Sequence, residues 1–225
     1  MPKKSIQSTR LPHAPLASTL FLREKGDVLE ILAGNVVLLS SAALETEHAF
    51  GKLAVDRGRV LVGGLGFGAT LRGVLEGASP HTEVVVAEKV LGVADLLRGE
   101  LGERFGRPLD DPRVTVVADD VYDAMGRQPS RWDAILLDVD NGPDWATFRV
   151  NARLYSPAGL AVAHAALAPG GFLAVWSGYP ADGFLASLRA AGFASKLVPL
   201  RERGRVRARA YVGTVGDVSA ISPAR

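Results

Sequence analysis

The stretch Val60–Thr70, VLVGGLGFGAT, constrains the fold of this chain most. An apolar run enters a turn with Gly64, Gly66 and Gly68, and the turn opens a helix. A second apolar run ends on Glu88, 20 residues beyond the last of these glycines. The glycines permit a tight turn and close approach of a ligand, and the helix N-terminus offers unpaired N–H groups. This pattern predicts an α/β protein that binds the ribose of a nucleoside or nucleotide through the glycine turn and Glu88.

Strand and helix patterns alternate from this point on. Continuous apolar runs predict strands at 59–63, 83–87, 114–118, 134–139 and 171–176. The segments between them predict helices at 68–77, 90–104, 157–167 and 181–191. Strands without polar alternation are typical of a parallel sheet that helices cover on both faces. We therefore expect a doubly wound, mostly parallel sheet.

The two ends of the chain differ from this alternation. Residues 28–32 and 36–40 flank a short Gly-Asn link and predict a β-hairpin, and 43–55 predicts a helix. Residues 195–200 and 206–214 predict a closing antiparallel hairpin. We expect a flexible tail at residues 1–18 and a small N-terminal β-hairpin region with its linking helix at 19–56. One Rossmann-like domain should follow at 57–225.

Composition narrows the function classes. The chain has no cysteine, and its four histidines are scattered without metal-ligand spacing, so we expect no metal site. A net charge of +2 does not by itself point to a polyanion partner. The sequence has no apolar run of membrane-helix length, and its basic start, MPKKSIQSTR, adjoins no signal-peptide core. We expect a cytoplasmic protein without a membrane partner.

Acids also follow the third and fourth predicted strands. Asp119 and Asp120 follow VTVVA, and Asp138 directly follows AILL. Ligands of doubly wound sheets lie beyond the carboxyl ends of the strands, where these side chains would join Glu88. Acids at such positions also serve as helix caps and turn residues. Asp138 is the most informative, because a charge still within the sheet requires a partner.

These residues resemble the spermidine synthase family, the polyamine aminopropyltransferases with a class I methyltransferase fold. The glycine loop and T-L-R of that family match GLGFGATLR at 64–72, and its ribose acid matches Glu88. Its adenine-side acid matches Asp120, next to Asp119, and its catalytic Asp matches Asp138 in DVDNGP. The resemblance extends from the hairpin near Val28 to about Trp176.

The departures from the family pattern fall on the amine side of the site. Phe67 replaces the acid of the glycine loop, which contacts the amine end of the donor. Phe50 replaces an acceptor-side Tyr, and Ser41 lies near the position of a Gln. The second acid of the family's catalytic loop has no secure match, although Asp140 or Asn141 could replace it.

The resemblance implies a transferase whose donor is decarboxylated S-adenosylmethionine or S-adenosylmethionine, with no metal. It implies transfer of an aminopropyl group to a small amine, with Asp138 as catalytic acid/base, and assembly as a homo-oligomer, most simply a dimer. Tryptophans are candidates for the acceptor pocket, namely Trp132, Trp145 and Trp176. Core packing is the alternative for Trp176 and the favoured interpretation for Trp132.

Three alternatives stay open at this point. The first is a small-molecule methyltransferase on the same fold. The second is an RNA-binding protein that uses the alternating arginines of 201–209. Charge that protects the edge of a hairpin explains these arginines better, so we disfavour a nucleic-acid partner. The third is a non-catalytic homologue that serves mainly in assembly. The acceptor and the carboxylation state of the donor do not follow from the sequence.

Overall fold

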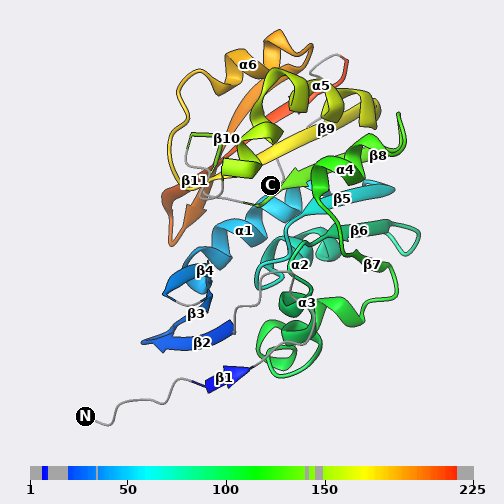
Figure 1. Cartoon of the computed structure of the whole chain (residues 1–225). Coiled ribbons are helices and arrows are strands. Elements are labelled where there is room, and N and C mark those ends of the chain that lie inside the picture. Colours follow the sequence, from blue (N-terminus) through cyan, green and yellow to red (C-terminus); the bar gives the residue numbers. More distant parts are fainter. Residues whose placement is uncertain (1–6, 10–19, 34, 140–141, 145–148, 217–225) are drawn as a thin grey trace.

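The described part of the chain contains two β-sheets, which one helix connects, and further helices that pack on the larger sheet (Figure 1). The computed structural model describes residues 7–9, 20–33, 35–139, 142–144 and 149–216. The N-terminal sheet is antiparallel in the order β1-β2-β3-β4, and the larger sheet has the order β10-β11-β9-β8-β5-β6-β7.

The elements follow one another in a simple pattern. The N-terminal strands are β1 (Gln7–Thr9), β2 (Leu20–Lys25), β3 (Val28–Ala33) and β4 (Val36–Ser40). The strands of the larger sheet are β5 (Arg59–Gly63), β6 (Glu83–Ala87), β7 (Val114–Val117), β8 (Trp132–Leu137), β9 (Leu167–Ser177), β10 (Ala194–Glu202) and β11 (Arg205–Thr214). The helices are α1 (Leu44–Gly51), α2 (Ala69–Glu76), α3 (Leu91–Arg98), α4 (Val121–Gly126), α5 (Pro157–Ala166) and α6 (Phe184–Ala190). Short 3-10 turns occupy Ser41–Ala43, Lys52–Ala54, Glu103–Phe105, Pro108–Asp110 and Arg149–Tyr155.

The larger sheet reverses its direction of winding between β5 and β8. From β5 the chain moves outward through β6 and β7, and it then returns to the other side of β5 with β8 and β9. These five strands pair in parallel, whereas β10 and β11 close the sheet as an antiparallel hairpin. The loops after β5 and β8 therefore meet at the switch point, where such sheets bind ligands.

Helices cover the sheet on both faces because its strands present apolar side chains to both. The core on one face joins α1, α2 and α3 to the even-numbered residues of β8, such as Leu136. The core on the other face joins α4, α5 and α6 to the odd-numbered residues, such as Leu137. This double burial explains the uninterrupted apolar runs of the sequence.

Helix α1 connects the N-terminal sheet to the α/β domain. Leu29 and Ile31 of β3 belong to the same apolar core as Phe50 of α1, and all three are buried. The α1 and α2 backbones touch, because a Cβ on Gly51 would lie 2.0 Å from the carbonyl oxygen of Thr70 and one on Gly73 would lie 2.1 Å from that of His48. Both positions require glycine, which fixes α1 over the start of α2.

The doubly wound fold with a C-terminal antiparallel hairpin is confirmed, as is the N-terminal hairpin. The hairpin pairs Ile31 with Leu39 and belongs to a larger sheet, since β2 and β1 extend it; Gly34 in its link lies outside the described residues. The segment predicted as a loose tail thus contains the short strand β1. The predicted helix at 90–104 ends at Arg98, and the strand predicted from residue 171 begins at Leu167.

Helix α4 was not predicted. The acids at 119–123 were interpreted as a strand end and loop, yet Asp120 caps a helix at this place, with its side chain accepting a hydrogen bond from Tyr122 N. Among the residues that the structure describes, no helix has the length and apolar character needed to cross a membrane.

Candidate active site

The glycine turn between β5 and α2 has three glycines in the left-handed region, with φ of 86° at Gly64, 51° at Gly66 and 76° at Gly68. Packing requires two of them: a Cβ on Gly64 would lie 2.3 Å from the carbonyl oxygen of Asp138, and one on Gly68 would lie 2.8 Å from Cγ of Pro108. A Cβ on Gly66 would meet nothing within 4 Å. The middle glycine therefore borders open space at the carboxyl end of the sheet.

Glu88 follows β6 and holds the glycine turn in place. Its Oε2 accepts a hydrogen bond of 2.9 Å from Leu65 N, and its Oε1 accepts one of 2.7 Å from Val90 N. Burial raises the pKa of this carboxyl, although the backbone hydrogen bonds oppose the rise. Each carboxylate oxygen has a second lone pair, so Glu88 can still accept hydrogen bonds from a diol.

Asp138 lies at the end of β8, beside the glycine turn. Its backbone N donates to Gly63 O over 2.9 Å, which continues the sheet, and its Oδ2 accepts a hydrogen bond of 2.6 Å from Thr70 Oγ1 of α2. Burial raises the pKa of Asp138 to about 6, and the Thr70 hydrogen bond opposes the rise. A carboxyl with this pKa can take and release a proton near neutral pH.

Glu47 of α1 is a second acid near Asp138 that the sequence analysis did not identify. Burial raises its pKa well above the usual range, and the charge of Asp138 raises it further. The backbone of the same residue contacts the site, because Glu47 O accepts from Thr70 Oγ1 over 3.2 Å. No local motif marks Glu47 among the acids of this helix; the close crossing of α1 and α2 brings it here.

Asp119 and Asp120 follow β7 and are engaged in contacts within the protein. Asp120 Oδ2 accepts from Lys89 Nζ over 2.9 Å and from Arg153 Nη2 over 2.6 Å. Burial opposes ionisation of Asp120, but hydrogen bonds from Lys89, Tyr122 N and Arg153 bring its pKa below the usual value. Asp119 accepts from Asp120 N over 2.9 Å and pairs with Arg127. Both acids thus have structural roles, and their contact with an adenine remains a proposal.

The residues that depart from the family pattern have structural roles too. Phe67 is 2% exposed and packs against Phe105, with 4.9 Å between ring centroids. Phe50 is fully buried in the same core. Ser41 Oγ accepts from Leu29 N over 2.8 Å, which ties the hairpin to the helix that follows.

The tryptophans lie at opposite ends of the sheet. Leu137 of β8 pairs with Val175 of β9, so Asp138 and Trp176 lie at the same level along their strands. Trp176 is buried, and its Nε1 has no hydrogen-bond partner among the described residues. Trp132 begins β8 at the end of the strand away from Asp138, and it is buried in the apolar core, which agrees with core packing rather than a place in the acceptor pocket. The remaining candidates, Trp145, Asp140 and Asn141, lie outside the described residues.

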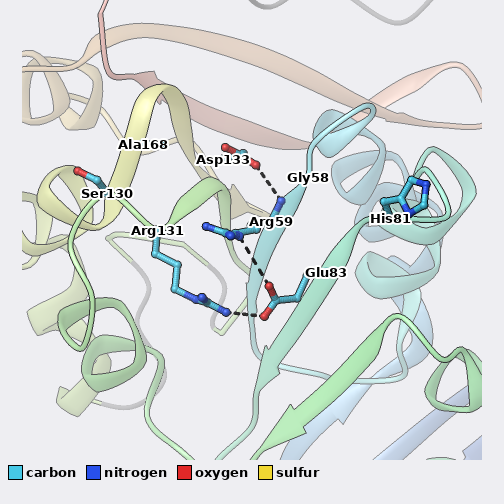
Figure 2. Close-up of a pocket in the computed structure, with 8 residues that line it drawn as sticks. All are labelled: Gly58, Arg59, His81, Glu83, Ser130, Arg131, Asp133 and Ala168. Atoms are coloured by element: carbon cyan, nitrogen blue, oxygen red, sulfur yellow. Dashed lines mark hydrogen bonds and ion pairs between the residues drawn. The ribbon is translucent and has the colours of Figure 1, made fainter.

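A cavity of about 360 Å³ opens at the amino ends of the parallel strands (Figure 2). Glu83 lines the cavity and pairs with Arg59 and Arg131, while Asp133 accepts from Arg59 N over 2.8 Å. The cavity is therefore at the edge of the sheet opposite to Asp138. Nowhere in the described segments do three or more His, Asp or Glu side chains gather as a metal site.

Sequence comparison relates the chain to polyamine aminopropyltransferases. It is 38% identical over 128 residues to polyamine aminopropyltransferase 2 of Pseudomonas aeruginosa, across 55% of this chain and 34% of that protein. It is 35% identical over 145 residues to the polyamine aminopropyltransferase of Mycobacterium tuberculosis, across 60% of this chain and 27% of that protein. The matches thus span about a third or less of these relatives. No protein-family model matches the chain.

Solved structures with the same fold include spermidine synthases. Spermidine synthase in complex with the transition-state analogue AdoDATO superposes with a TM-score of 0.73 over 97% of this chain and 77% of that one, at 16% identity. The spermidine synthase from Thermotoga maritima superposes with a TM-score of 0.71 over 97% of this chain and 76% of that one, at 17% identity. A methyltransferase from Burkholderia thailandensis with bound S-adenosylhomocysteine superposes with a TM-score of 0.52 over 78% of this chain and 79% of that one, at 20% identity. The relatives in sequence confirm the predicted resemblance to the spermidine synthase family, and these structures confirm the fold.

Proposed function

We propose that this chain transfers an aminopropyl group from decarboxylated S-adenosylmethionine to a small amine, with Asp138 as the catalytic acid/base. The observation that carries the proposal is the place of Asp138, whose pKa is raised to about 6 at the switch point of the sheet, beside the glycine turn. The similarity to polyamine aminopropyltransferases supports the choice of reaction.

The glycine turn and Glu88 form the donor side of the proposed site. Gly66 borders open space, so a nucleoside can approach the backbone there without meeting a side chain. Glu88 already accepts from Leu65 N and Val90 N, and its remaining lone pairs fit the two hydroxyls of a ribose. Asp120, held by Lys89 and Arg153, is the proposed neighbour of the adenine.

Asp138 supplies the proton chemistry. An ordinary alkylamine has a pKa of about 10.4, so its deprotonation at pH 7.5 costs about 4 kcal/mol. In the proposed step the ammonium gives a proton to the Asp138 carboxylate, and the nitrogen lone pair attacks the carbon attached to sulfur. The C–S bond breaks, its electrons stay on sulfur, and a neutral thioether leaves. A positioned base of this kind contributes about 10²–10⁴-fold to the rate.

A second candidate function is methyl transfer from intact S-adenosylmethionine to a small molecule. The observation in its favour is Phe67, which is buried against Phe105 where the resembled family has an acid for the donor amine. A donor that also carries a carboxylate depends less on that acid.

Calorimetric titration with three ligands separates these functions. Decarboxylated S-adenosylmethionine, S-adenosylmethionine and methylthioadenosine are titrated separately into the protein. Tighter binding of the decarboxylated donor supports aminopropyl transfer, and tighter binding of the intact donor supports methyl transfer. If none of the three binds, the proposed donor site is wrong and the assembly role remains. Gel filtration then tests the expected homodimer.

A further inference from the structure

The tip of the β10–β11 hairpin projects beyond the rest of the larger sheet (Figure 1). Strand β9 ends at Ser177, which pairs with Arg209 of β11. From Arg205 to Ala208, β11 pairs with β10 alone among the described strands, and the turn between the two strands lies further out still. Residues 200–209 therefore form a two-stranded ribbon that extends past the carboxyl end of β9.

This ribbon, LRERGRVRAR, carries a concentrated positive charge. It contains five arginines and a single acid, Glu202. A cavity of about 210 Å³ lies at its tip, lined by Glu202 together with Arg203, Arg205 and Arg207. Because one acid cannot balance five arginines, the ribbon presents a strongly positive surface, which attracts anions.

The arginines of the ribbon differ from those elsewhere in their partners. In the rest of the described chain nine arginines pair with an Asp or a Glu, namely Arg23, Arg59, Arg98, Arg104, Arg107, Arg113, Arg127, Arg131 and Arg153. In the ribbon no guanidinium pairs with a carboxylate of the described residues. Arg201 Nη1 donates to Gly204 O over 2.9 Å, and Arg203 contacts Glu45 of α1 only through its backbone N, over 3.2 Å. The positive groups of the ribbon can thus bind an anion from outside the chain.

The turn of the ribbon has an arginine where the backbone favours other residues. Arg203 and Gly204 are the two central residues of the turn, with φ of 48° and 78°. Asn, Asp and Gly are preferred at the first of these positions, because a left-handed backbone strains most other residues. Arg203 is also exposed, so packing does not explain its presence. A strained residue of this kind indicates a functional role for its side chain.

Protection of the sheet edge does not account for these arginines. Strand β10 is the outer strand of the sheet, and along β11 its edge already carries Lys196 and the exposed Pro199. Lys and Pro are the residue types that keep an edge from pairing with another chain. The part of β11 that lies beyond β9, at 205–208, is short, and a short edge pairs poorly in any case. The arginines gather at this short part and at the turn, not along the longer edge.

The composition of the ribbon favours duplex DNA among polyanions. A protein interface requires an apolar core, but Val206 is the one exposed large apolar side chain of the ribbon, whereas phosphate contacts require only cations. Single strands are bound largely through aromatic stacking, and the ribbon has no aromatic residue. The major groove of B-DNA is about 12 Å wide and admits a two-stranded β-ribbon, whereas that of A-form RNA is too narrow.

We propose that the ribbon at residues 200–209 binds duplex DNA, with its arginines on the phosphates that border the major groove. Guanidinium groups suit this role because they make two parallel hydrogen bonds to phosphate oxygens. The DNA site is separate from the proposed reaction centre, since Asp138 follows β8, and β9 lies between β8 and β11. The inference therefore goes beyond the proposed function and does not depend on it.

The salt dependence of binding tests the proposal. Fluorescence anisotropy follows a short labelled DNA duplex of mixed sequence as the full chain is added, without donor or acceptor. Contacts to three to five phosphates give a slope of about −2.7 to −4.5 for log Kobs against log salt concentration. The affinity should therefore fall by about 40- to 500-fold between about 50 and 200 mM salt. Binding that is absent at the lowest salt, or that does not change with salt, overturns the proposal.

Two variants and a control locate the contact. Arg205→Gln and Arg207→Gln should each make the slope shallower by about 0.9, the contribution of one phosphate. Arg98→Gln removes an arginine of α3 that pairs with Asp95, and it should leave the slope unchanged. Equal slopes in the unmodified protein and in both ribbon variants would place the DNA contact elsewhere and overturn the proposal. Tighter binding of oligouridine or of polyglutamate than of the duplex would overturn the choice of partner.

Discussion

The hydroxyl of Thr70 and the carboxylate of Asp138 form a hydrogen bond of 2.6 Å across 68 residues of sequence. Thr70 is the second residue of α2, after the glycine turn, and Asp138 directly follows the neighbouring strand β8. The bond therefore joins the proposed donor side of the site to the proposed base. The first prediction concerns this base.

Asp138→Asn should reduce aminopropyl transfer by about 10²–10⁴-fold, because the amide cannot accept the proton of the amine. Binding of methylthioadenosine should change little, since Glu88 and the glycine turn remain. Initial rates and calorimetry on the same preparation measure both effects. Asp123→Asn, an exposed acid of α4, is the control. An equal loss of nucleoside affinity and turnover would mean that Asp138 only holds the site together.

Glu88→Gln should weaken binding of methylthioadenosine by about tenfold or more, the loss expected for one charge-assisted hydrogen bond. The amide keeps one oxygen but turns an NH₂ group toward Leu65 N or Val90 N, which disturbs the glycine turn as well. Calorimetry measures the affinity. The control is Glu83→Gln, which changes an acid at the opposite end of β6 and should leave the affinity for methylthioadenosine unaltered. An unchanged dissociation constant in Glu88→Gln would remove Glu88 from the donor site.

Two glycines of the turn should respond differently to alanine. Gly64→Ala should destabilise the protein strongly, because its Cβ would lie 2.3 Å from Asp138 O. Gly66→Ala meets no atom within 4 Å, so it should cost only the left-handed backbone penalty of about 1–2 kcal/mol. Urea denaturation compares the two variants. A folded Gly66→Ala should still lose affinity for methylthioadenosine; full affinity would place the donor elsewhere.

Phe67→Asp restores the acid of the resembled family, yet it should not restore a donor contact. It removes a buried ring from the contact with Phe105 and buries a charge, at a cost of about 3–5 kcal/mol. Phe67→Leu, which keeps an apolar side chain, should cost less, and denaturation curves compare the pair. A stable Phe67→Asp variant with stronger preference for the decarboxylated donor would show that this position faces the donor.

Stability should fall as the pH rises from about 4 to about 6. Asp138 has a folded pKa raised to about 6, whereas the ordinary pKa of an Asp in an unfolded chain is 3.8. In this window the folded state binds more protons than the unfolded state, so raising the pH favours unfolding. The contribution is on the order of 1–3 kcal/mol. Asp138→Asn should flatten the decrease in urea denaturation across this range; an identical decrease in the variant would contradict the raised pKa.

The sequence predicts the α/β domain well because its signals are local. The glycine turn, the apolar runs of β5 and β6, and the acids after them follow from backbone freedom and burial, which a short segment reveals. Helix α4 was missed because Asp120 was interpreted as a ligand residue, although Asp before V-Y-D-A-M is also a helix-capping signal.

Contacts between distant segments account for what the sequence did not reveal. Glu47 resembles any acid of a surface helix until Gly51 and Gly73 bring α1 against α2. Phe67 stands where the resembled family has an acid, but its burial against Phe105 depends on the segment after α3, far along the chain. The sheet register separates Trp132, at the start of β8, from Trp176, near the end of β9, and no local signal in the sequence shows this separation.

The most direct test of the proposed reaction is to identify its products. The purified protein is incubated with decarboxylated S-adenosylmethionine and 1,4-diaminobutane, and mass spectrometry follows both substrates. We predict equal amounts of methylthioadenosine and of the diamine enlarged by one aminopropyl group, with both formed about 10²–10⁴-fold more slowly by Asp138→Asn. Formation of S-adenosylhomocysteine and a methylated amine from S-adenosylmethionine, with no aminopropyl product, would contradict the proposed reaction.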